Sequence, residues 1–178
     1  MGRGVILGED CLGWVRAAGF HPVVADDGDV HLRSQKQPST GYFIRRRGLE
    51  RFELTQDDED APSERGLLFV AEVDVLEHYL VGHFADDIRE DLDLPLLEQP
   101  WRSADLADGY DLTAAERGYR TLRRVGGVPV AAAPDDSLSL LALVPLSHYL
   151  GWSIRDLKQS FLSPAGSPLM RQGRYSRP

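Results

Sequence analysis

Two consecutive stretches of alternating residues, each with a turn signal inside it, constrain the fold of this 178-residue chain more than any other feature. The first reads HPVVADDGDVHLRS, in which DDG separates two runs that contain apolar residues. The second reads GYFIRRRGLERFELTQ and turns near Gly48. Runs of this kind around a glycine-containing turn predict β-hairpins. The expected inward-facing residues of the second hairpin are Tyr42, Ile44, Phe52 and Leu54.

A long amphipathic segment, EVDVLEHYLVGHFADDIRE, follows at residues 72 to 90. At 100° per residue its apolar side chains fall within a sector about 120° wide, which predicts one long central helix. These side chains are Val73, Leu76, Leu80, Phe84 and Ile88. A helix of this length places Asp86 and Asp87 near its C-terminus, where the helix dipole disfavours negative charge. A helix alone gives no reason for that placement.

Shorter elements surround these features. Residues 9 to 18 carry an approximate helical stripe with acids in the first turn, and residues 67 to 71 read as a strand. Residues 112 to 133 fit either a helix or a hairpin, and the VGGV turn favours the hairpin. The continuous apolar run SLSLLALV at residues 137 to 144 predicts a buried strand, and a short helix is expected to begin near Pro145.

The C-terminal part of the chain is expected to begin with the helix SIRDLKQSFL. Ser153 is its predicted N-cap, with Asp156 three residues later. From about residue 164 the sequence predicts a loosely structured tail. No repeat or linker divides the chain. The sequence therefore predicts a single α+β domain over residues 1 to 178, with a mainly antiparallel sheet built from hairpins, the central helix and C-terminal helices.

Charge and composition limit the classes of function. The formal net charge of -8 disfavours nucleic-acid binding, since phosphate recognition depends on basic charge. No run of eighteen apolar residues is present, so no membrane span is expected. The single cysteine, Cys11, excludes an internal disulfide and a multi-cysteine zinc site, and it fits a reducing cytoplasm. An acidic protein of this kind is better suited to a basic protein partner.

Candidate catalytic groups are few. His78 and His83 are five residues apart, hence about 140° apart around a helix, so they cannot chelate one metal ion together. His83 could pair with Asp87, and Cys11 could act as a nucleophile, so a small cytosolic hydrolase or transferase is one alternative. The competing interpretation is a local contact beside the core for the pair and a small core residue for the cysteine. No metal or cofactor is expected.

Three longer phrases resemble a known family. GYFIRRRGLERFELTQ, DVLEHYLVGHFADDIRE and ALVPLSHYLGWSIRDLKQSFLSPAGSPL occur in this order between about residues 41 and 170. Together they resemble the actinobacterial immunity proteins that neutralise the tuberculosis necrotizing toxin. The resemblance implies a cytosolic antitoxin without catalytic residues of its own. Such a protein binds a secreted, NAD-hydrolysing toxin domain in a one-to-one complex and blocks its active site. A regulatory module that binds another basic protein is a further alternative.

Two segments are candidate contacts for such a toxin. Residues 57 to 66, DDEDAPSERG, begin with four consecutive acids and are expected to form an exposed loop. Residues 91 to 111 predict an irregular connection with two aromatic anchors. An NAD-cleaving site must hold a pyrophosphate, so acidic groups would be attracted to it, and aromatic residues dominate interface energies. The candidate toxin-binding residues are Asp57, Asp58, Glu59, Asp60, Trp101, Asp105, Asp108 and Tyr110.

Overall fold

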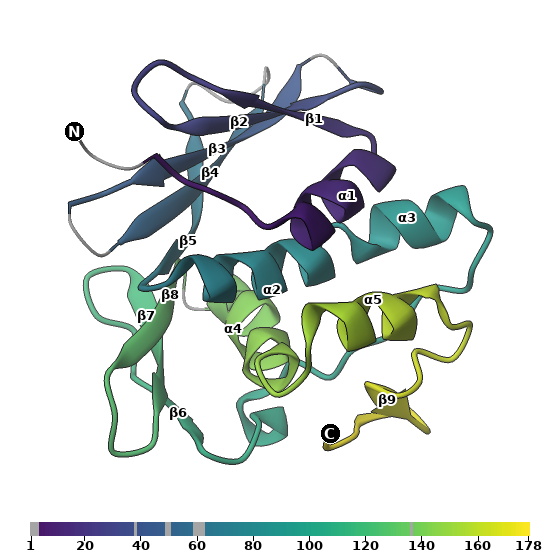
Figure 1. Cartoon of the computed structure of the whole chain (residues 1–178). Coiled ribbons are helices and arrows are strands. Elements are labelled where there is room, and N and C mark those ends of the chain that lie inside the picture. The colour runs from purple at the N-terminus through teal and green to yellow at the C-terminus, as the bar shows by residue number, and fades with distance from the viewer. Residues whose placement is uncertain (1–3, 38, 49–50, 59–62, 136) are drawn as a thin grey trace.

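The computed structural model describes the chain except for residues 1–3, 38, 49–50, 59–62 and 136. Its main element is an eight-stranded antiparallel sheet in the order β1-β2-β3-β4-β5-β8-β7-β6 (Figure 1). The strands are β1 Phe20–Val24, β2 Val30–Ser34, β3 Thr40–Arg46, β4 Phe52–Asp58, β5 Arg65–Val70, β6 Tyr110–Leu112, β7 Tyr119–Arg124 and β8 Pro129–Pro134. The sheet therefore grows by hairpins, apart from the step that places β8 beside β5.

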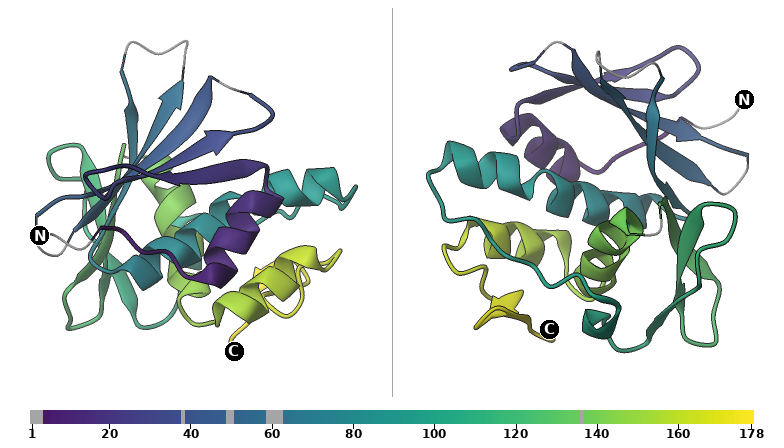
Figure 2. Two further views of the ribbon diagram at one scale, coloured as in Figure 1. Left: turned by 45° about the horizontal axis from the view of Figure 1, so that its top comes forward. Right: turned by 180° about the vertical axis from the view of Figure 1, so that it is seen from behind.

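The helices gather on one side of the twisted sheet (Figure 2). They are α1 Glu9–Ala17, α2 Val73–His83, α3 Ala85–Asp91, α4 Leu138–Tyr149 and α5 Ile154–Leu162, with a 3-10 turn, η1, at Ser103–Asp105. Fully buried side chains from the sheet and the helices form one core between the two layers. This arrangement confirms the predicted single α+β domain. None of the described helices is long and apolar enough to cross a membrane.

Both predicted hairpins are confirmed. In the first, β1 pairs with β2, with Val24 opposite Val30. The turn requires Gly28, whose φ is 87°, and the N-terminal segment crosses so closely that a Cβ on Gly28 would lie 2.7 Å from the Cα of Gly4. In the second hairpin, β3 pairs with β4. Its Tyr42, Ile44 and Leu54 are buried and Phe52 packs at the core edge, as predicted.

The expected single helix over residues 72 to 90 is divided at Phe84, and this corrects the prediction. Phe84 has φ -90° and ψ 2°, which ends α2 and begins α3. Its ring is fully buried and lies 4.7 Å from the Phe20 ring centroid and 5.3 Å from that of Tyr42. Packing of this ring against the sheet coincides with the break. Asp86 and Asp87 consequently occupy the first turn of α3, where the helix dipole favours negative charge.

The predicted strand at residues 137 to 144 is wrong, because this segment forms most of helix α4. Pro145 lies inside that helix and does not begin a new one. The carboxylate of Asp135 accepts hydrogen bonds from the backbone N–H groups of Ser137 and Leu138, at 2.9 and 3.1 Å. A helix that is apolar on most sides has no 3.6-residue period, so its sequence resembles that of a buried strand.

Three further predictions have clear outcomes. Residues 119 to 134 form the hairpin β7–β8, as favoured over a helix. The hydroxyl of Ser153 accepts from the backbone N–H of Asp156 at 3.1 Å, which confirms the N-cap of α5. The acidic segment does not begin as a loop, since Asp57 and Asp58 extend β4 and pair with Gly41 and Thr40.

The C-terminal residues are more ordered than the expected loose tail. They include a small hairpin, β9 Met170–Arg171 with β10 Arg174–Tyr175. Leu169 is fully buried, and its backbone N–H donates to the hydroxyl of Ser160 at 3.0 Å. The ring of Tyr175 stacks on His148 of α4, with 3.7 Å between centroids. These contacts attach the C-terminus to α4 and α5.

Candidate functional site

A groove of about 800 Å³ lies beside α4. Its walls come from α2, α3, α4, the ends of β5, β7 and β8, and residues 96 to 101, which run past α4 toward η1 (Figure 2). Five large apolar side chains that remain 37% to 74% exposed line it. They are Leu96, Trp101, Tyr119, Leu138 and Leu141. We refer to this hollow as the apolar groove.

Most polar groups of the apolar groove already have partners within the chain. Asp135 caps α4, and the amide oxygen of Gln99 accepts from the hydroxyl of Tyr149 at 2.5 Å. The guanidinium of Arg65 donates to the amide oxygen of Gln56 at 2.9 Å. Asp86 is an exception among these polar groups. Within the described chain its carboxylate has neither a hydrogen bond nor an ion pair. The residue is exposed, but partial burial of its carboxylate raises its pKa, and the positive charge of Arg89 opposes that rise.

His83 also lines the groove, but it does not form an acid–base pair with Asp87. The imidazole stacks on Tyr79 with centroids 5.4 Å apart and meets Tyr42 edge-on at 5.1 Å. Burial, together with the positive charge of Arg65, lowers the pKa of His83 to about 4. Among the described residues no hydrogen bond links His83 to Asp87, and Asp87 follows the break at Phe84. The expected role of this pair in catalysis therefore has no geometric support.

The other candidate catalytic and metal-binding groups are engaged in packing. Cys11 is fully buried, and burial raises the pKa of its thiol to about 12, so it is not a thiolate near neutral pH. The two ring nitrogens of His78 lie 2.7 Å from the Asp74 carbonyl oxygen and 2.9 Å from that of Trp152. Among the residues that the structure describes, no group of three His, Cys, Asp or Glu side chains could hold a metal ion.

The structure separates the predicted toxin-binding residues into different environments. Asp57 is exposed at the end of β4, while Glu59, Asp60 and the side chain of Asp58 lie outside what the structure describes. Trp101 lines the apolar groove and is 45% exposed. The carboxylate of Asp105 accepts from the backbone N–H of Arg102 at 3.0 Å, as the cap of η1.

The last two predicted residues follow η1 in the chain and are not among the residues that line the groove. Asp108 pairs with Arg177, and both side chains are exposed. Tyr110 begins β6 and packs partly against the core. Asp108 thus lies in an exposed ion pair with the C-terminal segment, and Tyr110 lies at the edge of the core.

The two predicted segments are not adjacent. Four strand-to-strand steps separate β4, which carries Asp57, from β6, which carries Tyr110, or about 19 Å at about 4.8 Å per step. The apolar groove nevertheless approaches both segments. Arg65, the register partner of Gln56 next to Asp57, lines it on one side, and Trp101 lines it on another. The sequence did not indicate Leu138 and Leu141 as site residues, because their segment was predicted to be a buried strand.

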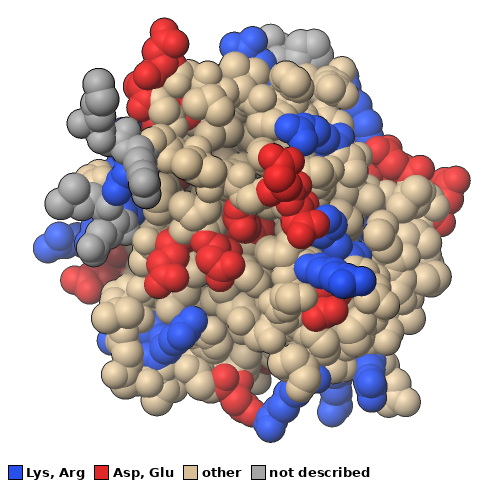
Figure 3. Space-filling model, viewed as in Figure 1, with Lys and Arg blue, Asp and Glu red and all other residues tan. Residues whose placement is uncertain are grey.

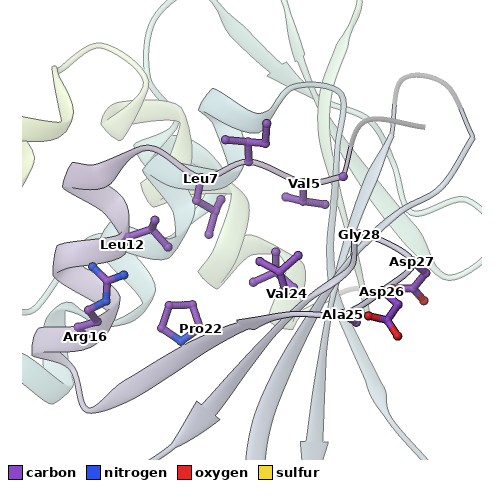
Figure 4. A pocket seen from close by; sticks show the side chains of 13 residues that line it. Val5, Leu7, Leu12, Arg16, Pro22, Val24, Ala25, Asp26, Asp27 and Gly28 are labelled. Carbon is purple, nitrogen blue, oxygen red and sulfur yellow. The ribbon is translucent and has the colours of Figure 1, made fainter. Parts of the chain in front are cut away.

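A second hollow of about 550 Å³ lies between the N-terminal segment, α1 and the edge strand β1. Figure 4 shows Leu12, Pro22 and Val24 facing this space, with Arg16 at one end and Asp26 at the other. Since its charged groups lie at opposite ends, they do not converge on one ligand. Acidic and basic side chains are likewise intermingled over the face that carries α1, α2 and α5 (Figure 3).

Comparisons with known proteins identify the family. The family model described as Immunity protein 61 matches residues 14–169. Two curated relatives are 33% identical over 173 residues, which is 93% of each chain: "Immunity factor for TNT" from Mycobacterium tuberculosis and "Immunity factor for TNT homolog" from Mycobacterium bovis. The solved structure "Rv3902c from M. tuberculosis" superposes with a TM-score of 0.83 at 30% identity, covering 95% of this chain and 96% of that one. The chain therefore belongs to the Immunity protein 61 family.

Proposed function

We propose that this chain is an immunity factor that binds and inhibits a toxin domain of the TNT type. The observation that carries the proposal is its 33% identity, over 93% of its length, to proteins named as immunity factors for TNT. Inhibition is proposed to act by binding alone, without catalysis. In support of this, Cys11 is buried as a protonated thiol and His83 is held among aromatic rings.

The proposed mechanism is occlusion of the toxin's active site in a one-to-one complex in the cytoplasm. A toxin that hydrolyses NAD must hold a negatively charged pyrophosphate, so its site presents positive charge. An immunity protein with a formal net charge of -8 is attracted to such a site and excludes the dinucleotide from it. Of the predicted contacts, the exposed Asp57 at the end of β4 and the exposed Trp101 are the best placed to meet a partner.

The test is to mix the purified chain with the cognate toxin domain and to follow NAD consumption. Hydrolysis is expected to stop at an equimolar ratio, and the two proteins are expected to co-elute from gel filtration as a one-to-one complex. Undiminished hydrolysis together with separate elution would refute the proposed function. Formation of a complex without inhibition would refute only the occlusion mechanism.

A further inference from the structure

We propose that the apolar groove is the main anchor point for the toxin, and that it receives a toxin segment bearing an apolar side chain and a neighbouring lysine or arginine that pairs with Asp86. This inference rests on the proposed function and specifies the surface that performs it.

The walls of the groove have the composition of an interface centre. Leu96 and Trp101 come from the connection between α3 and η1, Tyr119 comes from β7, and Leu138 and Leu141 come from α4. Large apolar side chains that converge on one hollow, and stay exposed, mark binding sites more often than isolated exposed ones. Tryptophan and tyrosine are also the residue types that most often dominate binding energy.

Asp86 determines the charge of the expected partner. Asp86 lines the groove and is exposed, and among the described side chains none forms a hydrogen bond or an ion pair with its carboxylate. A carboxylate in such a setting is stabilised when a cation approaches and completes the pair. Asp135, the other acid of the groove, is already occupied by the backbone of α4. A basic side chain at the edge of an apolar segment therefore complements the groove in both shape and charge.

The groove is held open by internal hydrogen bonds. The hydroxyl of Tyr149 donates to Gln99 and so ties residues 96 to 101 to α4. The Nε2 atom of His148 lies 2.7 Å from the carbonyl oxygen of Asp105 and fixes the same segment at η1. A preformed site loses little conformational freedom on binding, which favours affinity.

The experiment measures the affinity of the purified toxin domain for paired variants of the full chain. Leu138→Glu and Leu141→Glu are each expected to raise Kd about ten-fold or more. Leu162→Glu, at a leucine of α5 with similar exposure, is the matched control and leaves Kd within about two-fold. Thermal unfolding by circular dichroism verifies that each variant is folded.

Asp86 is tested with a second pair. Asp86→Asn is expected to raise Kd about ten-fold and to reduce the salt dependence of binding. Glu90→Gln, which removes an exposed carboxylate from the same helix, leaves both unchanged. Asp86→Glu keeps the charge and recovers part of the affinity. In addition, the fluorine signal of 5-fluorotryptophan at position 101, assigned with Trp101→Phe, is expected to shift when toxin binds.

The outcomes separate the two proposals. If the unmodified chain does not bind the toxin, the proposed function fails. If it binds and inhibits but the groove variants do so equally well, only the groove assignment is overturned. If the free chain forms a dimer that Leu138→Glu dissociates, the groove is instead occupied by a second copy of this chain, and the assignment is likewise overturned.

Discussion

At the scale of single residues, Arg89 illustrates how the chain buries a charge without an opposing carboxylate. Its side chain is 2% exposed, and its guanidinium donates to four backbone carbonyl oxygens, those of Pro95, Phe161, Ser163 and Pro164. Three of these residues, Phe161, Ser163 and Pro164, lie in or just beyond the last turn of α5, the negative end of that helix. Arg89 thereby joins α3, the connection after it and the end of α5.

Replacing this residue has a large expected cost. Arg89→Ala leaves four carbonyl oxygens without their donor in the interior, so the free energy of unfolding should fall by about 3–5 kcal/mol. Urea unfolding followed by circular dichroism measures the change. Arg155→Ala, at an exposed arginine of α5, is the control and should shift stability by no more than about 0.5 kcal/mol. Equal effects of the two variants would contradict the assigned role.

His83 makes stability depend on pH. Its pKa is lowered to about 4 in the folded protein, below the value of about 6.5 expected for an unfolded chain. Between these values only the unfolded state takes up the proton. The contribution of neutral His83 to the free energy of unfolding is therefore fully present above about pH 6.5. As the pH falls from there toward 4, the free energy of unfolding decreases by up to about 1.4 kcal/mol per pH unit.

This dependence can be measured by urea unfolding at pH 7, 6, 5 and 4. His83→Gln is expected to flatten the decline relative to the unmodified chain, since the glutamine does not titrate. His21→Gln, at an exposed histidine of β1, is the matched control and should keep the original slope. An unaltered slope in His83→Gln would show that His83 does not titrate in the folded protein as stated.

At the scale of elements, the contact between α2 and α4 depends on a glycine. A Cβ at Gly82 would overlap the ring of Tyr149, so only glycine lets the two helices approach this closely. Tyr149 is 4% exposed and also meets the ring of Phe161 in α5 at 5.7 Å. The close approach of α2 and α4 thus positions a ring that helps to form the floor of the apolar groove.

Two helical glycines provide a matched test of this contact. Gly82→Ala is expected to lower the free energy of unfolding by about 1–2 kcal/mol, because the added methyl displaces the Tyr149 ring. Gly13→Ala, in α1 with open space around the new Cβ, should raise it by about 0.5–1 kcal/mol through helix propensity. If both substitutions stabilised the protein, the packing argument for Gly82 would be wrong.

At the scale of the whole molecule, the excess of negative charge bears on encounter with the toxin. Acidic groups at the end of β4 are proposed to steer the complex toward the positively charged NAD site. Reversal of Asp57, Asp58, Glu59 and Asp60 to lysine should slow association, weaken binding and reduce its salt dependence. Stopped-flow association at several ionic strengths provides the measurement.

The control for this variant must have the same net charge. Reversal of Glu9, Asp26, Glu72 and Glu116, which are exposed acids on separate elements, meets that condition. If the acids of residues 57 to 60 have a specific role, these scattered reversals should slow association less than the reversal of residues 57 to 60 does. If both variants slow association equally, only net charge matters, and the segment from residue 101 to 110 becomes the better candidate contact.

Features governed by local sequence were predictable. Turn glycines and alternating residues specified the hairpins β1–β2, β3–β4 and β7–β8, because a hairpin forms between neighbouring residues. The N-cap at Ser153 was predictable for the same reason. Family membership was also evident from phrases in the chain. Each of these determinants lies within a stretch of no more than 28 residues.

Only the tertiary structure decided the rest. The division at Phe84 coincides with burial of its ring against β1 and β3. The segment 137 to 144 forms a helix although its nearly continuous apolar sequence resembles that of a buried strand, and its Leu138 and Leu141 stay exposed. The apolar groove joins residues from β5, α2, the 96 to 101 segment, β7, β8 and α4. Local propensity specifies elements, whereas contacts between residues far apart in the chain determine where elements break and which surfaces remain open.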